Sequence, residues 1–272
     1  MAGFAVEDMF LKAAAKVLPV GQILMIFGVA GFAAFAALLW RQGLRVRHPL
    51  MTARPVIARA GFEVAGRLFY TLAIALTPLS SASAILQASP LVVVAGAALV
   101  FGEGVGWRRW LAIVTGFAGV LVILRPGLDG FTPLSLLAVA GMLGFATRDL
   151  ATRAAPRGLT NLHLGAYGFA MLVPTGAAVL AVTGGATLPG PAQTAQLAAA
   201  TLFGVAAYYA LTAAMRQGQI ATVAPFRYTR LVFALILGVA VFGESPDAAT
   251  LAGSAIIVAS GGYALIRTSA RR

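Results

Sequence analysis

Long apolar stretches, separated by short segments rich in Pro, Gly and Arg, follow one another along almost the whole chain. A helix needs about 20 mostly apolar residues to cross a bilayer, and nine stretches satisfy that condition. They are residues 20–40, 56–76, 79–101, 107–124, 132–154, 162–183, 194–215, 220–242 and 248–266. This spacing predicts an all-α integral membrane protein, with Pro and Gly at the joints between spans.

An internal repeat accounts for the segment before these spans. Residues 1–18 are too short and too charged for an ordinary span, but a shift of 141 positions places Asp8 on Asp149. The same shift superimposes two Phe-Gly-Glu triplets, 101–103 and 242–244. We therefore predict a single transmembrane domain of ten helices, built as two repeats of five, with the first helix truncated at its N-terminus. The repeats are residues 1–126 and 127–272.

The distribution of cations agrees with this arrangement. Repeats with an odd number of spans lie in opposite orientations, as in many secondary transporters, and Lys and Arg in short loops face the cytoplasm. Alternate joints and the C-terminal tail hold Arg41, Arg45, Arg47, Arg54, Arg108, Arg109, Arg153, Arg157, Arg216, Arg267, Arg271 and Arg272. The opposite joints hold Lys16 and Arg125. We expect a multi-pass protein of the bacterial inner membrane with both termini in the cytoplasm.

Composition excludes several classes of function. The 272 residues are 60% hydrophobic and 10% charged, which is far from a soluble domain. The net charge of +12 is spread over loops between apolar stretches, so nucleic acid is excluded as a partner. The chain has no Cys and two distant His, which leaves little for a metal site or a nucleophilic triad. We expect no metal, no cofactor and no enzymatic activity.

The repeat and its motifs resemble a known family. Two five-span repeats, each with a span that ends in Phe-Gly-Glu, are similar to the EamA family of the drug/metabolite transporter superfamily, as are Gly119 and Gly253 in the spans that follow. Within it, the chain is most similar to the YddG-type bacterial exporters of aromatic and other amino acids. The resemblance covers nearly the whole chain except the front of the first helix. It implies that the last span of each repeat lies at the periphery.

Ionisable residues inside the spans are the candidates for function, because a charge in the bilayer costs about 2.5–3.5 kcal/mol on insertion scales. In the 56–76 span, Glu63, Arg67 and Tyr70 follow helical spacing and share one face. Two interpretations stay open for this face. One is an ion pair between Glu63 and Arg67 that pins the helix, and the other is a role in substrate binding or gating.

The repeat distinguishes structural from functional charges. Each copy contains an acid–base pair at i, i+4 spacing: Asp8–Lys12 and Asp149–Arg153. Their recurrence favours a structural role. Glu7 and Arg148, by contrast, occupy one repeat position with opposite charges. Because symmetry does not explain that difference, we expect these two residues to line a substrate cavity.

The 220–242 span contains Arg227, Tyr228 and Arg230 close to the membrane midplane. Arginines facing lipid at that depth are unfavourable, so they should point to a cavity or to acidic partners such as Glu63. Two guanidinium groups on one face suit a substrate carboxylate. The alternative is that backbone carbonyls hold them.

A polar group near a proline recurs in the other repeat, where Gln87 aligns with Tyr228. Tyrosines from several spans are suited to stack an aromatic substrate, although packing is the alternative. The predicted cavity residues are Glu7, Tyr70, Gln87, Arg148, Tyr208, Arg227 and Tyr228. The candidates for gating or proton coupling are Glu63, Arg67, Asp149 and Arg230.

These observations predict a secondary transporter that exports amino acids, aromatic and other neutral ones, or similar small metabolites by alternating access. One alternative is a cationic-drug or multidrug exporter, which would use an embedded carboxylate such as Glu7 or Glu63. Another is a nucleotide-sugar or phosphate-ester antiporter, which the midplane arginines favour. The expected partners are a small-molecule substrate and the lipid bilayer, with monomer and homodimer both open.

Overall fold

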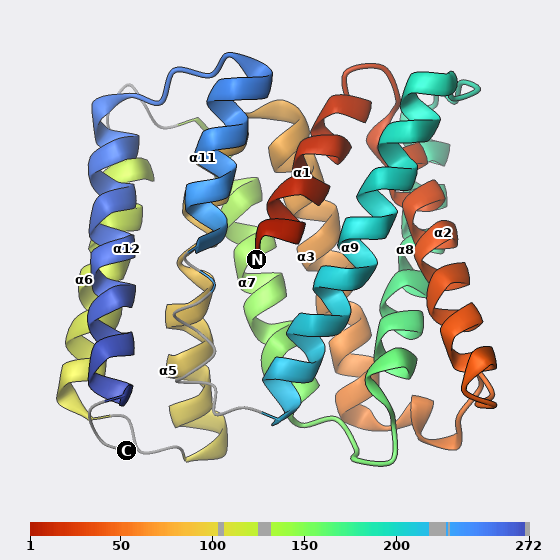
Figure 1. The fold of residues 1–272 in the computed structure, drawn as a ribbon, viewed down its shortest axis with the longest axis horizontal. Helices are drawn as coiled ribbons and strands as arrows, with labels where there is room; N and C mark the ends of the chain where they lie inside the picture. Colours follow the sequence, from red (N-terminus) through yellow and green to blue (C-terminus); the bar gives the residue numbers. More distant parts are fainter. Residues whose placement is uncertain (103–105, 125–131, 218–226, 228, 270–272) are drawn as a thin grey trace.

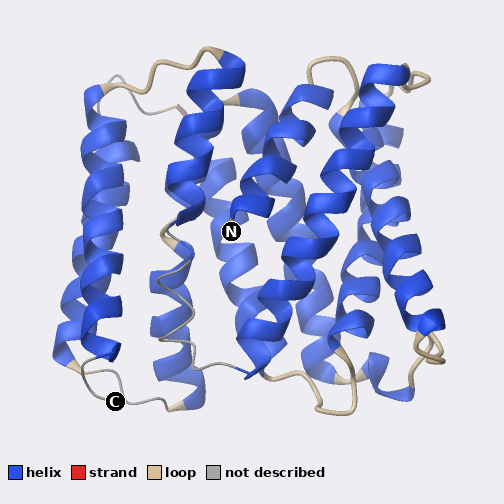
Figure 2. Cartoon of the chain, viewed as in Figure 1, coloured by secondary structure: helices blue, strands red, loops and turns tan. Residues whose placement is uncertain are grey.

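The computed structural model describes residues 1–102, 106–124, 132–217, 227 and 229–269, which form helices joined by loops (Figure 1, Figure 2). The helices are α1 (Ala2–Ala14), α2 (Val20–Arg41), α3 (Arg54–Leu76), α4 (Leu79–Leu86), α5 (Ser89–Phe101), α6 (Trp107–Leu124), α7 (Ser135–Arg153), α8 (Asn161–Thr183), α9 (Pro191–Gln217), α11 (Thr229–Phe242) and α12 (Ala248–Ser269). A short 3-10 helix, η1 (Pro49–Thr52), precedes α3.

Every predicted span contains a helix, and one span is broken in two. Residues 79–101 form α4 and α5, which separate at Gln87 and Ala88. Pro90 lies in the first turn of α5, where its missing N–H does no harm, whereas inside a continuous helix it would remove a hydrogen bond. Gln87, at this break, is buried and lines the central cavity described below.

Within the described residues, four helical segments are long and apolar enough to cross a membrane by length and composition: Val20–Arg41, Leu79–Phe101, Asn161–Thr183 and Pro191–Gln217. α3 and α7 are absent from this group although they have 23 and 19 residues. Both contain several charged residues, which lower their hydropathy. These two helices therefore supply most of the buried charge described below.

The two halves of the chain run in opposite directions. In Figure 1, α1 rises from the middle of the molecule while its counterpart α7 descends, and α2 descends while α8 rises. Helix contacts occur as symmetry mates: α3 packs on α7 as α9 packs on α1, and α5 packs on α7 as α11 packs on α1. α2 with α8 and α6 with α12 are pairs of equivalent helices. The fold is thus ten transmembrane helices in two inverted repeats. The predicted boundary at 126/127 lies outside the described residues.

α1 has 13 residues against 19 in α7, and its first residue lies about halfway along the height of the molecule (Figure 1). At the left edge of that view, α6 and α12 pack mainly against each other, with smaller contacts to α4 and α5. Gly119 and Gly253 form their contact, since a Cβ at Gly119 would lie 2.8 Å from the Gly253 carbonyl oxygen. Small residues permit such close approach between membrane helices. The peripheral pair therefore supplies packing rather than a site.

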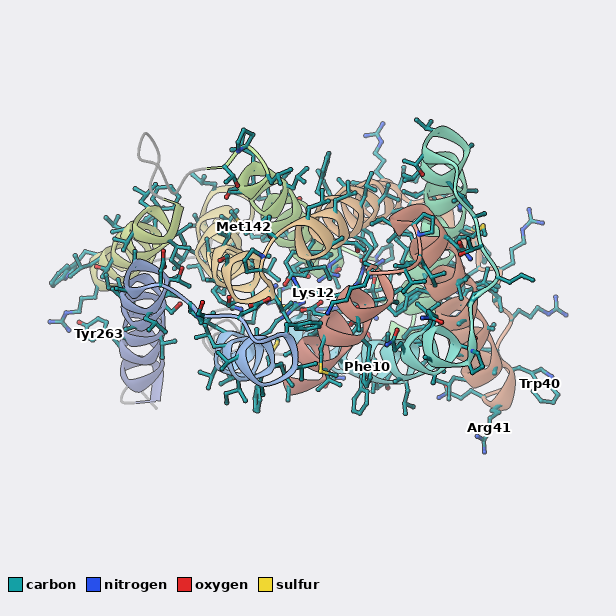
Figure 3. The ribbon with its side chains drawn as sticks, turned by 90° about the horizontal axis from the view of Figure 1, so that it is seen from above. Phe10, Lys12, Trp40, Arg41, Met142 and Tyr263 are labelled. Carbon is teal, nitrogen blue, oxygen red and sulfur yellow. The ribbon has the colours of Figure 1, made fainter. Side chains whose placement is uncertain are left out.

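The predicted cation-rich joints all lie at one end of the molecule, the lower end in Figure 1. The described arginines of this end are Arg41, Arg45, Arg47, Arg54, Arg108, Arg153, Arg157 and Arg216. Seen from above, Trp40 and Arg41 project from the edge, whereas Lys12 points into the interior (Figure 3). The exposed cations thus mark one membrane face, while the interior holds a separate set of charges.

Candidate functional site

A cluster of buried charge occupies the centre of the molecule. Nine aspartate, glutamate and arginine side chains there are each no more than 9% exposed: Glu7, Asp8, Arg59, Glu63, Arg67, Arg148, Asp149, Arg227 and Arg230. They come from α1, α3, α7, α11 and the residue two positions before α11. Five are arginines and four are carboxylates, so the fully ionised cluster has an excess of one positive charge. A buried charge without a counter-charge is expensive.

The part of the cluster nearest the arginine-rich end joins α3 to α7, α8 and α9. Arg148 donates to both carboxylate oxygens of Glu63, at 3.3 and 3.4 Å, and the Tyr208 hydroxyl donates to Glu63 as well. Arg59 donates to Thr152 Oγ1 at 2.9 Å, to the Leu164 carbonyl at 3.0 Å and to the Tyr208 hydroxyl. This network crosses the boundary between the repeats and closes the cluster on that side.

Two further arginines reach across from α11 and the residues before it. Arg227 donates to Asp149 Oδ2, and Arg148 donates to Asp149 Oδ1 at 2.8 and 3.0 Å. Arg230 donates through Nε and Nη2 to Asp8 Oδ2. The equivalent aspartates of the two repeats thus both receive an arginine from the α11 region. The repeat symmetry is broken because the position equivalent to Arg230 is Ser89.

Tyr70 and Arg67 connect α3 to the charges on α1. The Tyr70 hydroxyl donates to Asp8 Oδ2 at 3.3 Å and lies 3.1 Å from Ser83 Oγ. Arg67 donates to Glu7 Oε1. The other oxygen of Glu7 has no hydrogen-bond partner among the described residues and lies against Gly204 on α9, where a Cβ would be 3.0 Å from it. Gly204 is the repeat counterpart of Glu63, and its missing side chain makes room for Glu7.

A small cavity lies among these charges. Its volume is about 20 Å³, which is room for a single water molecule. It is lined by Met1, Phe4, Arg67, Leu86, Gln87, Phe145, Arg148, Leu211, Arg227 and Arg230. Its polar wall is therefore four guanidinium groups and one amide. Gln87 Nε2 and Arg67 Nε have no hydrogen-bond partner among the described residues, so two buried donors are unused there.

Aromatic rings form the other part of the wall. The guanidinium carbons of Arg148 and Arg67 lie 4.9 and 5.6 Å from the centre of the Phe145 ring. Arg230 lies 5.0 Å from the centre of the Phe4 ring. Such cation–π contacts hold the guanidinium groups in place without using their N–H donors. Arg67 Nε, which has no partner among the described residues, is thus available as a donor to a ligand.

The structure places the predicted cavity residues in two groups. Gln87, Arg148 and Arg227 line the cavity. Glu7, Tyr70 and Tyr208 are absent from its lining: Glu7 accepts from Arg67, Tyr70 donates to Asp8, and Tyr208 donates to Glu63. Tyr228 lies outside the described residues. Of the gating candidates, Arg67 and Arg230 also line the cavity, and Glu63 and Asp149 hold Arg148. Their roles in transport stay predictions.

Partners within one helix, expected from the sequence, are replaced by partners across helices. Glu63 receives Arg148 and Arg67 turns to Glu7, instead of the two forming their own pair. Lys12 does not form an ion pair with Asp8. It pairs with Glu244 instead and donates to the Ile74 and Thr77 carbonyls. Neighbouring helices bring acceptors closer than the i, i+4 partner, whose pairing contributes only about 0.2–0.5 kcal/mol in an isolated helix.

Sequence reasoning missed Arg59, which is 1% exposed and lies one turn before Glu63. Its signal was available, since Arg59 extends the face formed by Glu63, Arg67 and Tyr70. Phe4 and Phe145 were also missed, and nothing in an apolar helix distinguishes a cavity phenylalanine from a packing one. Their role depends on which helices meet.

The second Phe-Gly-Glu triplet closes the opposite end of the cluster. The Glu244 carboxylate accepts from Leu79 N at 2.6 Å, Ser80 N at 3.0 Å and Ser80 Oγ at 2.7 Å, and Lys12 Nζ lies 3.4 Å away. We call Glu244, Lys12 and the first turn of α4 the Glu244 latch. Gly243, with φ of 65°, supplies the left-handed turn that aims Glu244 at α4.

The ionisation of Glu244, in the loop after α11, follows from these contacts. Partial burial favours the neutral acid, but the hydrogen bonds from Ser80 and Leu79 and the nearby Lys12 outweigh it and lower the pKa of Glu244 below its ordinary value. A carboxylate at a helix N-terminus is also stabilised by the helix dipole. The latch therefore joins the second repeat to the first as an ionised contact.

Comparisons with known proteins agree with this arrangement. A riboflavin transporter of Rhizobium johnstonii is 31% identical over 223 residues, which cover 80% of this chain and 70% of that protein. An S-adenosylmethionine uptake transporter of Rickettsia bellii is 25% identical over 214 residues, 78% of this chain and 73% of that protein. A pseudopaline exporter of Pseudomonas aeruginosa is 26% identical over 263 residues, 94% and 89%.

A solved crystal structure shares the fold, with a TM-score of 0.74 and 20% identity over 100% of this chain and 97% of that one. The profile of the EamA-like transporter family matches residues 1–125 and 133–266. These two matches cover both halves of the chain, as expected for two copies of one repeat. The protein therefore belongs to the EamA-like transporter family, whose small-molecule transport is the role that this membrane fold serves.

Proposed function

We propose that this protein is a secondary transporter that exports amino acids, or similar small metabolites with a carboxylate, through the arginine-lined cavity between its two repeats. The observation that carries the proposal is the excess of one arginine over the carboxylates in the buried cluster. A substrate carboxylate would neutralise that charge and use the free donors of Arg67 and Gln87. Aromatic and other neutral amino acids supply one carboxylate and a side chain that suits Phe4 and Phe145.

The two closed ends of the cluster support alternating access. The network of Glu63, Arg148 and Arg59 closes the arginine-rich end, and the Glu244 latch closes the other. Both contacts join one repeat to the other, so rocking of the repeats would open one end while the other stays shut. The cavity of about 20 Å³ must expand to admit any metabolite. We infer that the structure represents a closed intermediate of this cycle.

The direction and orientation belong to the same proposal. The arginine-rich end faces the cytoplasm of a bacterial inner membrane by the positive-inside rule, which puts the end of α12 on the cytoplasmic side. Met1 lies about halfway along the height of the molecule and lines the cavity, at the end of α1 that points toward the same side. Support for export comes from the pseudopaline exporter that aligns over 94% of the chain. Relatives named for uptake use the same fold, and the reverse of the same cycle would produce uptake.

Riboflavin is a second candidate substrate. The transporter of Rhizobium johnstonii that is named for it is 31% identical to this chain. A flavin ring is planar and has polar groups along one edge, which fits a wall of guanidinium planes, phenylalanine rings and one amide. Riboflavin lacks a carboxylate, so it would leave the excess positive charge unneutralised. This difference ranks it second.

Transport by purified protein in liposomes tests the proposal. Vesicles loaded with a panel of radiolabelled amino acids, S-adenosylmethionine or riboflavin are diluted, and loss of label is followed for wild type, Arg227→Gln and Arg108→Gln. We expect amino-acid efflux that Arg227→Gln slows by at least about tenfold, since a hydrogen bond to a charged group contributes about 1.5–3 kcal/mol. Arg108→Gln should match wild type. Transport of riboflavin alone, or amino-acid efflux that Arg227→Gln leaves unchanged, would overturn the carboxylate assignment.

A further inference from the structure

An apolar groove runs along the outside of the helix pair α2 and α9 and shares no lining residue with the central cavity. Its volume is about 740 Å³. On α2 the lining residues recur every fourth position, namely Ile26, Ala30, Ala34 and Leu38. Twelve residues of helix span about 18 Å, which exceeds the roughly 15 Å depth of one bilayer leaflet. The groove is therefore long enough for a lipid acyl chain.

Small side chains make this surface concave. Ala30 and Ala34 on α2 and Ala198 and Ala206 on α9 line the groove, together with longer side chains such as the exposed Leu202. A flat, well-packed helix pair would present no such hollow to lipid. The groove is open on the outer surface of the molecule, where hydrocarbon is the surrounding solvent in a bilayer.

A second recess begins where the groove ends. Its volume is about 670 Å³, and Tyr209 lines both hollows. Its described lining residues include Arg153, Arg157 and Arg216 and no aspartate or glutamate. It lies at the arginine-rich end, beside the loop between α7 and α8 and the end of α9. We call it the basic recess.

The arginines of the basic recess are held in different ways. Arg216 is anchored, since it donates to the Leu159 carbonyl at 2.6 Å, the Pro156 carbonyl at 3.1 Å and Asn161 Oδ1 at 3.0 Å. Arg157 is exposed. The basic recess thus combines a fixed guanidinium group, that of Arg216, with an exposed one, that of Arg157. This combination suits a phosphate, which accepts several hydrogen bonds.

Because the α2/α9 groove and the basic recess are joined at Tyr209, one ligand that fills both is the best candidate occupant. An apolar groove as long as an acyl chain leads through an amphipathic tyrosine to a cluster of cations at one membrane face. A helix from a second copy would fill the groove but would bring no phosphate to Arg157 and Arg216. A soluble metabolite would suit the basic recess but leave the groove empty. An anionic phospholipid satisfies both, because basic pockets beside membrane helices bind acidic headgroups.

We propose that the α2/α9 groove and the basic recess together form a binding site for one anionic phospholipid of the cytoplasmic leaflet. Its acyl chain lies between Ala34 and Ala206, and its phosphate lies between Arg157 and Arg216. The site is separate from the cavity and does not depend on which metabolite is transported. Occupied, it would stabilise the contact between α2 of the first repeat and α9 of the second.

Lipid retention by the purified full chain tests this site. The protein in a neutral detergent is titrated with phosphatidylglycerol or with phosphatidylcholine of the same acyl chains, and bound lipids are counted by native mass spectrometry. We expect one phosphatidylglycerol to bind more tightly than any phosphatidylcholine. Arg157→Gln should weaken it about fivefold, the effect of one cation near an anionic lipid surface. The matched control, Arg108→Gln, removes an exposed arginine of the same face outside the recess.

The groove is tested by a pair of neighbouring alanines. Ala34→Phe fills the hollow and should abolish tight binding, whereas Ala33→Phe places the same ring on an exposed, non-lining position and should leave it intact. Should Ala34→Phe fail to fold, Ala34→Leu replaces it. Equal retention of the two lipids, or equal effects of the two phenylalanine variants, would overturn the proposal. Displacement by glycerol phosphate as effectively as by the whole lipid would assign a phosphate site instead and likewise overturn it.

Discussion

Arg148 on α7 donates to both carboxylate oxygens of Glu63 on α3, at 3.3 and 3.4 Å, across the boundary between the two repeats. Both side chains are almost completely buried. Glu63 also accepts from Tyr208 and lies 3.8 Å from Arg59. Glu63 is thus the carboxylate partner of two arginines. Its loss would leave Arg59 without its carboxylate and Arg148 with Asp149 alone.

We predict that Glu63→Gln destabilises the protein by about 3–5 kcal/mol, because breaking a buried ion pair leaves an uncompensated charge. Adding Arg148→Gln should recover part of that loss. Unfolding of the purified variants by denaturant in detergent measures both effects. The control is Arg54→Gln, at the exposed start of the same helix. A Glu63→Gln protein as stable as the control would contradict the assigned pairing.

Gly204 should tolerate no side chain. A Cβ there would lie 3.0 Å from the Glu7 carboxylate and 3.0 Å from Phe27 Cζ. We expect Gly204→Ala to destabilise by about 1–3 kcal/mol, the usual cost of overpacking, and to impair the Arg67–Glu7 contact. Gly61→Ala is the control, since nothing lies within 4 Å of its Cβ position. Thermal unfolding should rank wild type and Gly61→Ala together, with Gly204→Ala below them. The reverse order would show that Glu7 lies elsewhere.

The neutral side chain of Gln87 should make the cavity favour a negatively charged group on the substrate. Its Nε2 is unused, and the residue lines the cavity. Gln87→Glu would cancel the excess positive charge, so we expect affinity for carboxylate substrates to fall at least about tenfold, the equivalent of about 1.4 kcal/mol. Gln87→Leu removes the donor without adding charge and should have a smaller effect. Competition by unlabelled substrate in liposomes measures both. Equal losses in the two variants would argue against an electrostatic role.

The Glu244 latch should make stability depend on pH. Because the pKa of Glu244 is lowered in the folded protein, its contribution is complete above the ordinary glutamate pKa of about 4.3 and is lost as the pH falls through the folded value. Between pH 6 and pH 3, the unfolding midpoint of wild type should therefore fall more steeply than that of Glu244→Gln. Ser80→Ala keeps the backbone N–H bonds and should show an intermediate slope. Parallel pH curves for all three proteins would contradict the conclusion that an ionised Glu244 stabilises the fold.

Much of the fold could be predicted because it depends on local properties. The sequence shows apolar stretches of helix length, loop cations at alternate joints and a repeat at a constant offset. The observed helices follow these predicted stretches closely. The first repeat's broken span was marked by Pro90, whose ring excludes an uninterrupted hydrogen-bond ladder. These features follow from the bilayer, which requires each span to satisfy its own backbone.

The candidate site was predictable only as a set of residues. The sequence identified Glu63, Arg67 and Arg148 as costly charges within spans, since their position in an apolar stretch suffices for that conclusion. It did not identify their partners. Helical spacing suggested a bond between Glu63 and Arg67, but the helix packing places other groups closer to each of them.

By itself, then, the sequence determined the membrane class, the inverted repeat and most of the buried charges, Arg59 excepted, because hydropathy and periodicity are carried by neighbouring residues. The tertiary structure alone decided which arginine meets which carboxylate and that four guanidinium groups surround one cavity. It also decided that Glu244 caps α4 in the other repeat. These contacts join residues from different helices, and their geometry depends on how whole helices pack rather than on any local pattern.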